Sequence, residues 1–453
     1  MAQSHAGRDD GEARLATGSI ARHLVAQTVP MIVGVAAIMS VGIVDAYFVG
    51  QLGPRELAAI SFVFPVTMAL SSLGVGVIAG ISSVVSREIG AGDMDEARRL
   101  ANLGITLSAL FGVVVAVLLV TLRAPLFRLL QADPELLPLI EAYMRPFALA
   151  FPLLLWLMGI SGCLRGQGAA KRAAAILLTF ALSSWVLDPI LVPRLGIAGA
   201  AYAAIGGWVL AGILTLILLQ TSNIRWQPRG LRGCNWKRGI GALVRVAGPA
   251  AFSNAINPTG LAVLTALLAR EGNAAVAGFG AGGRVQSFAV VPLLGLSSSI
   301  GAIVGQNWGA ERYDRVRQAL MLSGAFCVLY GLAVALILVL LRGSLGAFFS
   351  DDADVKRELA TYLSIGAWGY WAYGIQITTN GALNAVDRAS LALGQSLARM
   401  TLAMVPVAWV LRGAWGAQGV FAGELAANLF GGSIAMLAAY WVFWRGTRKA
   451  GAG

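Results

Sequence analysis

Long apolar runs alternate with short polar breaks along most of this chain. The runs are about 20 residues or longer, which is the length that an α-helix needs to cross a bilayer, whereas barrel strands would alternate with a period of two. The pattern predicts an all-α polytopic membrane protein with twelve transmembrane helices. The expected spans are residues 24–50, 57–83, 101–122, 138–163, 173–193, 196–220, 243–268, 275–303, 318–341, 359–384, 390–411 and 417–444.

Composition agrees with a membrane protein and disfavours a metal site or a catalytic centre. The chain is 57% hydrophobic and 12% charged, whereas soluble domains carry about 25% charged residues. Its two histidines are His5 and His23, and its three cysteines, Cys163, Cys234 and Cys327, have no metal-site spacing and form no disulfide framework. We therefore expect no cofactor, no bound metal and no enzymatic activity.

Basic residues fall unevenly on the two sets of loops. The termini and the loops on their side hold twenty-two Lys and Arg, against nine in the other loops. The positive-inside rule then places both termini in the cytoplasm of a multi-pass inner-membrane protein. The net charge of +12 is explained by this topology and by anionic lipid. We expect the lipid bilayer and small organic molecules as partners, no nucleic acid, and a monomer.

The second half of the chain repeats the first at a distance of 219 residues. Glycine, proline and charged residues coincide at loop boundaries, namely Pro30 with Pro249, Gly53 with Gly272, Gly90 with Gly309, and Asp95 with Asp314. Each unit contains six expected helices, so the two lobes enter the membrane from the same side. The expected parts are a cytoplasmic tail (1–22), an N-lobe (23–221), a cytoplasmic linker (222–241), a C-lobe (242–445) and a second cytoplasmic tail (446–453).

Several motifs resemble the multidrug and toxic-compound extrusion (MATE) family. They are "VDAYFVGQLGPRELAAIS", "CLRGQG" and "LNAVDRASLAL", in the order and spacing of that family. The resemblance covers nearly all of residues 20–445. It implies twelve helices in two six-helix lobes and cation-coupled antiport that exports small organic, cationic or amphipathic compounds.

Among the acids of the first lobe, two qualify most clearly as lying within the membrane, Asp45 in the first expected helix and Asp188 in the fifth. A charge within the bilayer is costly, by about 2.5–3.5 kcal/mol on insertion scales, so each acid is a functional candidate, although an interfacial acid is the simpler alternative. Both fall in the outward half of helices that run the same way, so we expect them to share a pocket. The resemblance implies that they are the coupling residues.

The nature of the coupling ion follows from two departures from the family pattern. Ser184 replaces an Asn that relatives with a sodium site often carry, and Ala204 replaces a Thr. Losing these oxygen ligands should weaken sodium binding more than proton binding, so we expect H⁺ coupling, with Na⁺ as the alternative.

The C-lobe has fewer acids at the family positions. Leu264 stands at the repeat position of Asp45, and Gln286 stands where many relatives carry Glu, so cation coupling is expected in the N-lobe. The expected substrate-cavity residues are Tyr47, Tyr202, Asn257, Arg284 and Gln286, although helix–helix hydrogen bonds would equally explain the last three. Two further transport functions stay open, a lipid-linked oligosaccharide flippase and an exporter of an endogenous metabolite. Few basic residues fall within the spans, which argues against the flippase, because that carrier needs a basic cavity for pyrophosphate.

Overall fold

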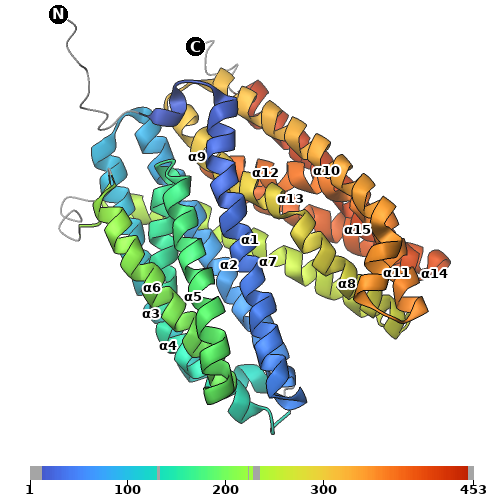
Figure 1. The fold of residues 1–453 in the computed structure, drawn as a ribbon. Helices are drawn as coiled ribbons and strands as arrows, with labels where there is room; N and C mark the ends of the chain where they lie inside the picture. Colours follow the sequence, from blue (N-terminus) through green and yellow to red (C-terminus); the bar gives the residue numbers. More distant parts are fainter. Residues whose placement is uncertain (1–12, 130–132, 223, 228–234, 447–453) are drawn as a thin grey trace, which may run out of the picture.

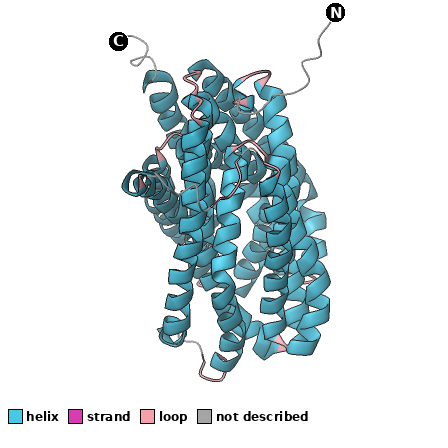
Figure 2. Cartoon of the chain, turned by 90° about the vertical axis from the view of Figure 1, so that its left-hand side faces the viewer, coloured by secondary structure: helices cyan, strands magenta, loops and turns pink. Residues whose placement is uncertain are grey.

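A computed structural model describes residues 13–129, 133–222, 224–227 and 235–446. The N-terminal tail up to residue 12, Cys234, most of the linker and the last seven residues lie outside this description. The described chain is built of helices and short connections (Figure 2). Its first lobe consists of η1 (Arg14–Ala16), α1 (Ile20–Leu52), α2 (Pro54–Ala91), α3 (Met94–Leu129), α4 (Leu137–Gly166), α5 (Ala170–Leu195) and α6 (Ile197–Gln220).

The second lobe repeats this arrangement with more interruptions. It consists of α7 (Trp236–Leu268), α8 (Asn273–Ala289), α9 (Val291–Gly309), α10 (Tyr313–Phe349), α11 (Ala353–Gly366), η3 (Ala367–Gly369), α12 (Tyr370–Ala385), α13 (Ala389–Ala398), the π-helix η4 (Arg399–Met404), α14 (Val405–Trp415), α15 (Ala417–Ala439) and the π-helix η5 (Tyr440–Arg445).

Helices are found over all twelve expected spans in order, but four of those in the C-lobe are not single regular α-helices, the last because 417–444 ends in η5. The span 275–303 is α8 and α9, which meet at Val290 with a bend of 45°. Pro292 lies in the first turn of α9 and has no N–H, so an unbroken helix would lack a hydrogen bond there. The span 359–384 is divided by η3, and 390–411 contains η4. Ten of the described helices are long and apolar enough to cross a membrane, or eleven if the bent pair counts as one span.

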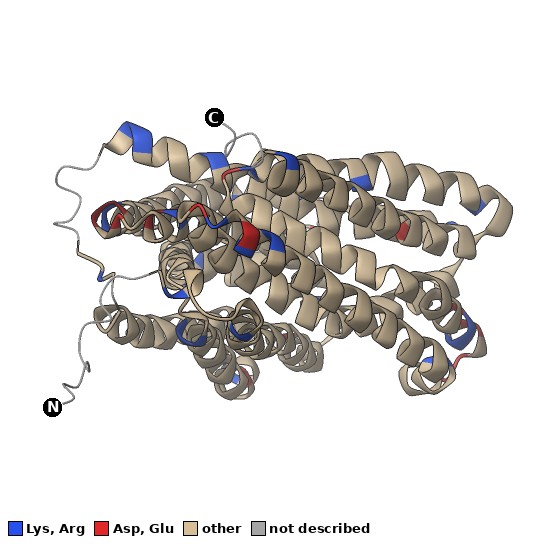
Figure 3. Ribbon diagram, turned by 90° about the horizontal axis from the view of Figure 1, so that it is seen from above, with Lys and Arg blue, Asp and Glu red and all other residues tan. Residues whose placement is uncertain are grey.

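The two lobes meet at the end of the molecule that carries both termini, and they diverge toward the other end (Figure 1). We call these the terminal end and the far end. Gly76 and Gly80 of α2 lie against the backbone of Leu243 and Ala247, in the first half of α7. Seen from the terminal end, most of the helical ribbon carries no charged residue, and acidic and basic residues gather mainly at helix ends (Figure 3).

Two repeat-related glycines form a pseudo-symmetric contact between the lobes. Gly90 at the end of α2 lies against the backbone of Gln306, and Gly309 at the end of α9 lies against the backbone of Arg87. Residues 87 and 306 are themselves related by the shift of 219. The absence of a side chain at both glycines therefore allows α2 and α9 to touch at the pseudo-twofold axis.

The first described residues form a strap over this contact, which we define as residues 14–18. The Leu15 amide donates to Gln306 Oε1 (3.1 Å), and Asn307 Nδ2 donates to the Leu15 carbonyl (3.0 Å). Gln306 Nε2 also donates to the carbonyl of Gly166 in the N-lobe (3.1 Å), while the Leu15 side chain lies against Gly168. The strap, the N-lobe and the C-lobe are thus tied together at the terminal end.

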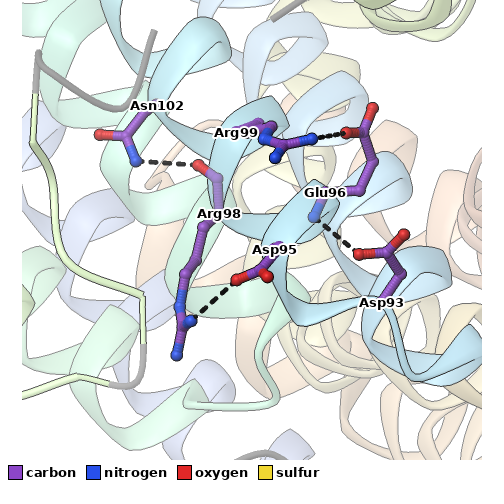
Figure 4. A network of polar contacts seen from close by, with 6 residues as sticks. All are labelled: Asp93, Asp95, Glu96, Arg98, Arg99 and Asn102. Atoms are coloured by element: carbon purple, nitrogen blue, oxygen red, sulfur yellow. Dashed lines mark hydrogen bonds and ion pairs between the residues drawn. The ribbon is translucent and has the colours of Figure 1, made fainter. Parts of the chain in front are cut away.

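The acidic sequence "DMDE" at the start of α3 forms ion pairs and a helix cap (Figure 4). Asp93 Oδ1 accepts from the Glu96 amide (2.9 Å), and Asp95 pairs with Arg98 (3.1 Å). Asn102, one turn further on, donates to the Arg98 carbonyl and accepts from the Gln227 amide (2.6 Å) of the linker. Among the described residues, no group of His, Cys, Asp and Glu could hold a metal ion.

Candidate functional site

The two acids predicted in the N-lobe lie on facing stripes of α1 and α5. Asp45 is on the same face of α1 as the buried Val41 and Val49, four residues before and after it. On α5, Asp188 follows the same spacing between Ser184 and Val192. The carboxyl groups of Asp45 and Asp188 face each other within hydrogen-bonding reach. The structure therefore brings these two residues together, as the sequence predicted.

Apolar layers enclose the acid pair on both sides along the helices. Toward the terminal end lies a cluster of Ala37, Val41 and Ala181. Toward the far end lies a cluster of Val49, Val192 and Ala200. Asp188 is 0% exposed, whereas Asp45 is half-buried.

Several polar atoms of this site have no partner other than the opposing acid. Neither carboxylate oxygen of Asp188, nor Ser184 Oγ one turn away, has a further hydrogen-bond partner among the described residues. The next residue, Pro189, has no N–H, which leaves the Trp185 carbonyl without its helical donor. Buried oxygens without donors favour a bound proton or cation, because leaving them unmatched is unfavourable.

Tyr143 of α4 is a third polar group near the pair, which the sequence did not single out. Its phenol lies within electrostatic range of both Asp45 and Asp188. The ring stacks on Phe147 (centroids 5.8 Å apart) and packs against the apolar cluster at Val49. No sequence signal separated this tyrosine from the other aromatic residues of the spans, since its role depends on α4 packing beside α5.

In the C-lobe, Gln286 binds an acid that the sequence analysis did not identify. Gln286 Nε2 donates to Glu424 Oε1 (2.7 Å), and the Tyr362 hydroxyl lies 3.0 Å from Gln286 Oε1 and 3.1 Å from Glu424 Oε2. Glu424 is in the first half of α15 and is 1% exposed. The signal was available, because Glu424 is an acid within an expected span, as Asp45 is.

Asn257 belongs to a second polar cluster of the C-lobe, centred on Arg399. Arg399 Nη1 donates to Asn257 Oδ1 (2.6 Å), and Nη2 donates to Asn428 Oδ1 (2.7 Å). Asn257 Nδ2 donates to the Tyr373 hydroxyl (3.1 Å), and the guanidinium lies over the Tyr373 ring at 5.1 Å. Arg399 is 7% exposed and begins the π-helix η4, a distortion frequent at functional sites. The structure thus places Asn257 and Gln286 in helix–helix hydrogen bonds.

The remaining predicted cavity residues, Tyr47, Tyr202 and Arg284, are exposed and make no described hydrogen bond. The Tyr47 ring meets only Phe48 edge-on, with centroids 5.2 Å apart. Their part in substrate binding stays a prediction.

Comparison with known proteins agrees with this architecture. The family model MatE matches the chain twice, over residues 30–190 and 249–410, that is, once in each lobe. The FAD transporter of Shewanella oneidensis is 34% identical over 400 residues, covering 87% of this chain and 88% of that protein. The probable multidrug resistance protein NorM of Deinococcus radiodurans is 27% identical and covers 84% of this chain and 86% of its own length.

A solved structure gives the same result. The crystal structure of the Vibrio cholerae MATE transporter VcmN in the bent form superposes with a TM-score of 0.89 and 28% identity, covering 94% of this chain and 98% of that chain. The doubled family match repeats the 219-residue shift found within the sequence. The chain therefore belongs to the MatE family of multidrug and toxic-compound extrusion transporters.

Proposed function

We propose that this transporter is an antiporter that exports small organic compounds in exchange for protons. The observation that carries the proposal is the enclosed pair of Asp45 and Asp188, which face each other and form no salt bridge with any cationic side chain of the described residues. Two carboxyl groups at hydrogen-bonding separation cannot both ionise without strong repulsion, so a shared proton is the favoured occupant. Sodium is the alternative ion, but Ala204 adds no oxygen ligand.

With both termini in the cytoplasm, the conformation described is outward-facing, because the lobes are closed at the terminal end. A proton from outside then binds at the pair of Asp45 and Asp188. Forming the carboxyl–carboxyl hydrogen bond draws α1 onto α5 and changes the face that α1 presents to the space between the lobes. A substrate and a proton that bind competitively to this region are coupled in antiport.

Dye efflux from inverted vesicles tests the ion and the site together. A proton gradient should drive transport by the wild type, and a sodium gradient alone should not. Asp45→Asn and Asp188→Asn keep the shape of each side chain but remove the exchangeable proton, so each should abolish proton-driven transport. Asp354→Asn, at an exposed ion pair of α11, is the matched control and should retain it. Full activity of both site variants, or equal transport under sodium alone, would contradict the proposal.

A flavin dinucleotide is a second candidate substrate, next to cationic drugs. It is favoured by the 34% identical relative named FAD transporter and by the buried cation Arg399, which suits an anionic cargo. Competition between FAD and a cationic dye in the same vesicles separates the candidates. Inhibition of dye efflux by FAD supports the dinucleotide, and unchanged efflux at saturating FAD excludes it.

A further inference from the structure

The acid of the C-lobe is buried without a salt bridge. Glu424, in the first half of α15, is 1% exposed, and the salt bridges of the described residues do not include it. The cation within electrostatic range is Arg399, whose two Nη groups are both directed at amide oxygens, of Asn257 and Asn428. An ionised carboxylate in such surroundings is unfavourable unless hydrogen bonds fully compensate its charge.

The hydrogen bonds around Glu424 form a closed ring of three side chains. Gln286 Nε2 lies 2.7 Å from Glu424 Oε1, the Tyr362 hydroxyl lies 3.1 Å from Glu424 Oε2, and the same hydroxyl lies 3.0 Å from Gln286 Oε1. The first contact has a fixed donor, because only the amide nitrogen carries hydrogen. The other two contacts share a single hydroxyl proton.

Counting protons distinguishes the two states of Glu424. If Glu424 is ionised, Tyr362 donates either to the carboxylate or to Gln286 Oε1, and the other oxygen is left without a donor. If Glu424 carries a proton on Oε2, it donates to Tyr362, Tyr362 donates to Gln286, and Gln286 donates back to Glu424. Only the protonated form satisfies all three contacts at once.

The neighbouring titratable groups do not alter this count. Of the elements around α15, α11 presents Tyr362, α12 presents Tyr370 and Tyr373, and η4 presents Arg399. The Tyr370 hydroxyl has no hydrogen-bond partner among the described residues, so it supplies no proton to Gln286. Gln286 is half-buried, which leaves the ring one edge through which a proton can exchange.

We propose that Glu424 is a proton-binding site of the C-lobe, occupied in the conformation described here and separate from the Asp45–Asp188 pair. The site is not a copy of the first, because the repeat partner of Glu424 is Ile205, and that of Asp188 is Val407. The inference deepens the proposed proton coupling and rests on it for a role in transport. Proton binding itself is measured independently.

Infrared spectroscopy of the purified full-length protein tests the proposal, because a protonated carboxyl group has a carbonyl stretching band that a carboxylate lacks. The Asp45→Asn/Asp188→Asn double variant removes the N-lobe contribution and should keep a band from a buried, protonated acid at neutral pH. Adding Glu424→Gln should remove that band, whereas adding Glu311→Gln, at an exposed turn, should not. A Gln amide can donate to Tyr362 as the protonated acid does, so the variant should keep the wild-type melting temperature.

Two results would overturn the inference, namely the absence of such a band in the double variant and a band that Glu424→Gln leaves unchanged. Glu424→Leu removes the ring and should lower the melting temperature, which shows whether the ring is formed in the purified protein. The proposed function fails by a different result, proton-driven efflux that survives Asp45→Asn and Asp188→Asn, so the two failures are distinguishable.

Discussion

The contact between Gly90 and Gly309 predicts that one added methyl group will shift the balance between the two conformations of the transporter. A Cβ at Gly90 would lie 2.8 Å from the carbonyl carbon and 2.9 Å from Cα of Gln306. Carbon atoms in contact prefer about 3.5–4.0 Å. The obstructing atoms belong to the backbone of α9, so a rotamer change cannot remove the clash. Gly90→Ala therefore requires α2 and α9 to separate by roughly 1 Å.

The free-energy change follows from overpacking. Forcing an extra methyl group into a packed interface costs about 1–3 kcal/mol. Alanine also favours helix over glycine by about 1 kcal/mol, but this gain is present in both conformations and cancels. The form closed at the terminal end should lose population relative to the opposite form by roughly 5- to 150-fold. Gly309→Ala should have the same effect, because its Cβ would meet the backbone of Arg87.

Pulsed electron paramagnetic resonance can measure the shift. Spin labels at Asp95 and Asp314 occupy repeat-related sites at the terminal end, where the side chains are 77% and 95% exposed. The described native cysteines, Cys163 and Cys327, are buried and can be replaced together with Cys234. Both glycine variants should move population from the shorter to the longer label distance.

Gly248→Ala, in α7, is the matched control. A Cβ at Gly248 would have no atom within 4 Å, so this variant adds a methyl group without a clash. Its distance distribution should equal that of the wild type. If Gly90→Ala and Gly309→Ala also leave the distribution unchanged, the glycine contact does not limit closure and the reasoning is refuted.

Two further variants test the C-lobe clusters through the melting temperature in detergent. Arg399→Lys loses the paired hydrogen bonds of a planar guanidinium, each worth about 1.5–3 kcal/mol, and should destabilise the protein. Arg284→Lys, at an exposed site, should not. Equal melting temperatures of the two variants would contradict the role assigned to Arg399. Gly282→Ala places a methyl group against the Tyr362 ring and should lower the free energy of unfolding by about 1–3 kcal/mol. The adjacent Gly283→Ala is the control, because its Cβ meets no atom within 4 Å. A tolerated Gly282→Ala would show that Tyr362 is not held where the proton count requires.

The sequence predicted the features of the fold that depend on local pattern. The spans were recognisable because an apolar helix of about 20 residues is required in any bilayer, and the repeat was recognisable because Gly90 and Gly309 recur at one spacing. The pairing of Asp45 with Asp188 was predicted from the direction of their helices and the resemblance. The bend at Val290 was not predicted, although Pro292 marks it, because proline is tolerated within several other helices here, as Pro65 is in α2.

The polar clusters of the C-lobe were not predicted, because they depend on tertiary packing. In α8 alone, Gln286 offers an amide where an acid is expected. The carboxylate of this site comes from α15, 138 residues away in the sequence. Similarly, Asn257 gave no indication of its contact with Arg399. A search of the spans for every acid, independent of family positions, would have found Glu424 but not its ring with Tyr362.

The strap at the terminal end has a consequence for how freely this region can vary in sequence. Its polar contacts use main-chain atoms, since Leu15, Ala16, Thr17 and Gly18 all offer carbonyl oxygens to Asn307, Arg312 or Arg315. A carbonyl is the same in every amino acid, so these strap positions can change identity while the C-lobe side chains that hold them cannot. Three positions are exceptions: the Leu15 side chain fills the space beside Gly168, Ala16 is buried, and Gly18 has a φ of +69°, which residues with a side chain rarely adopt. A mutational scan should therefore find tolerance at exposed Thr17 and sensitivity at Asn307, Arg312 and Arg315, which hold the strap.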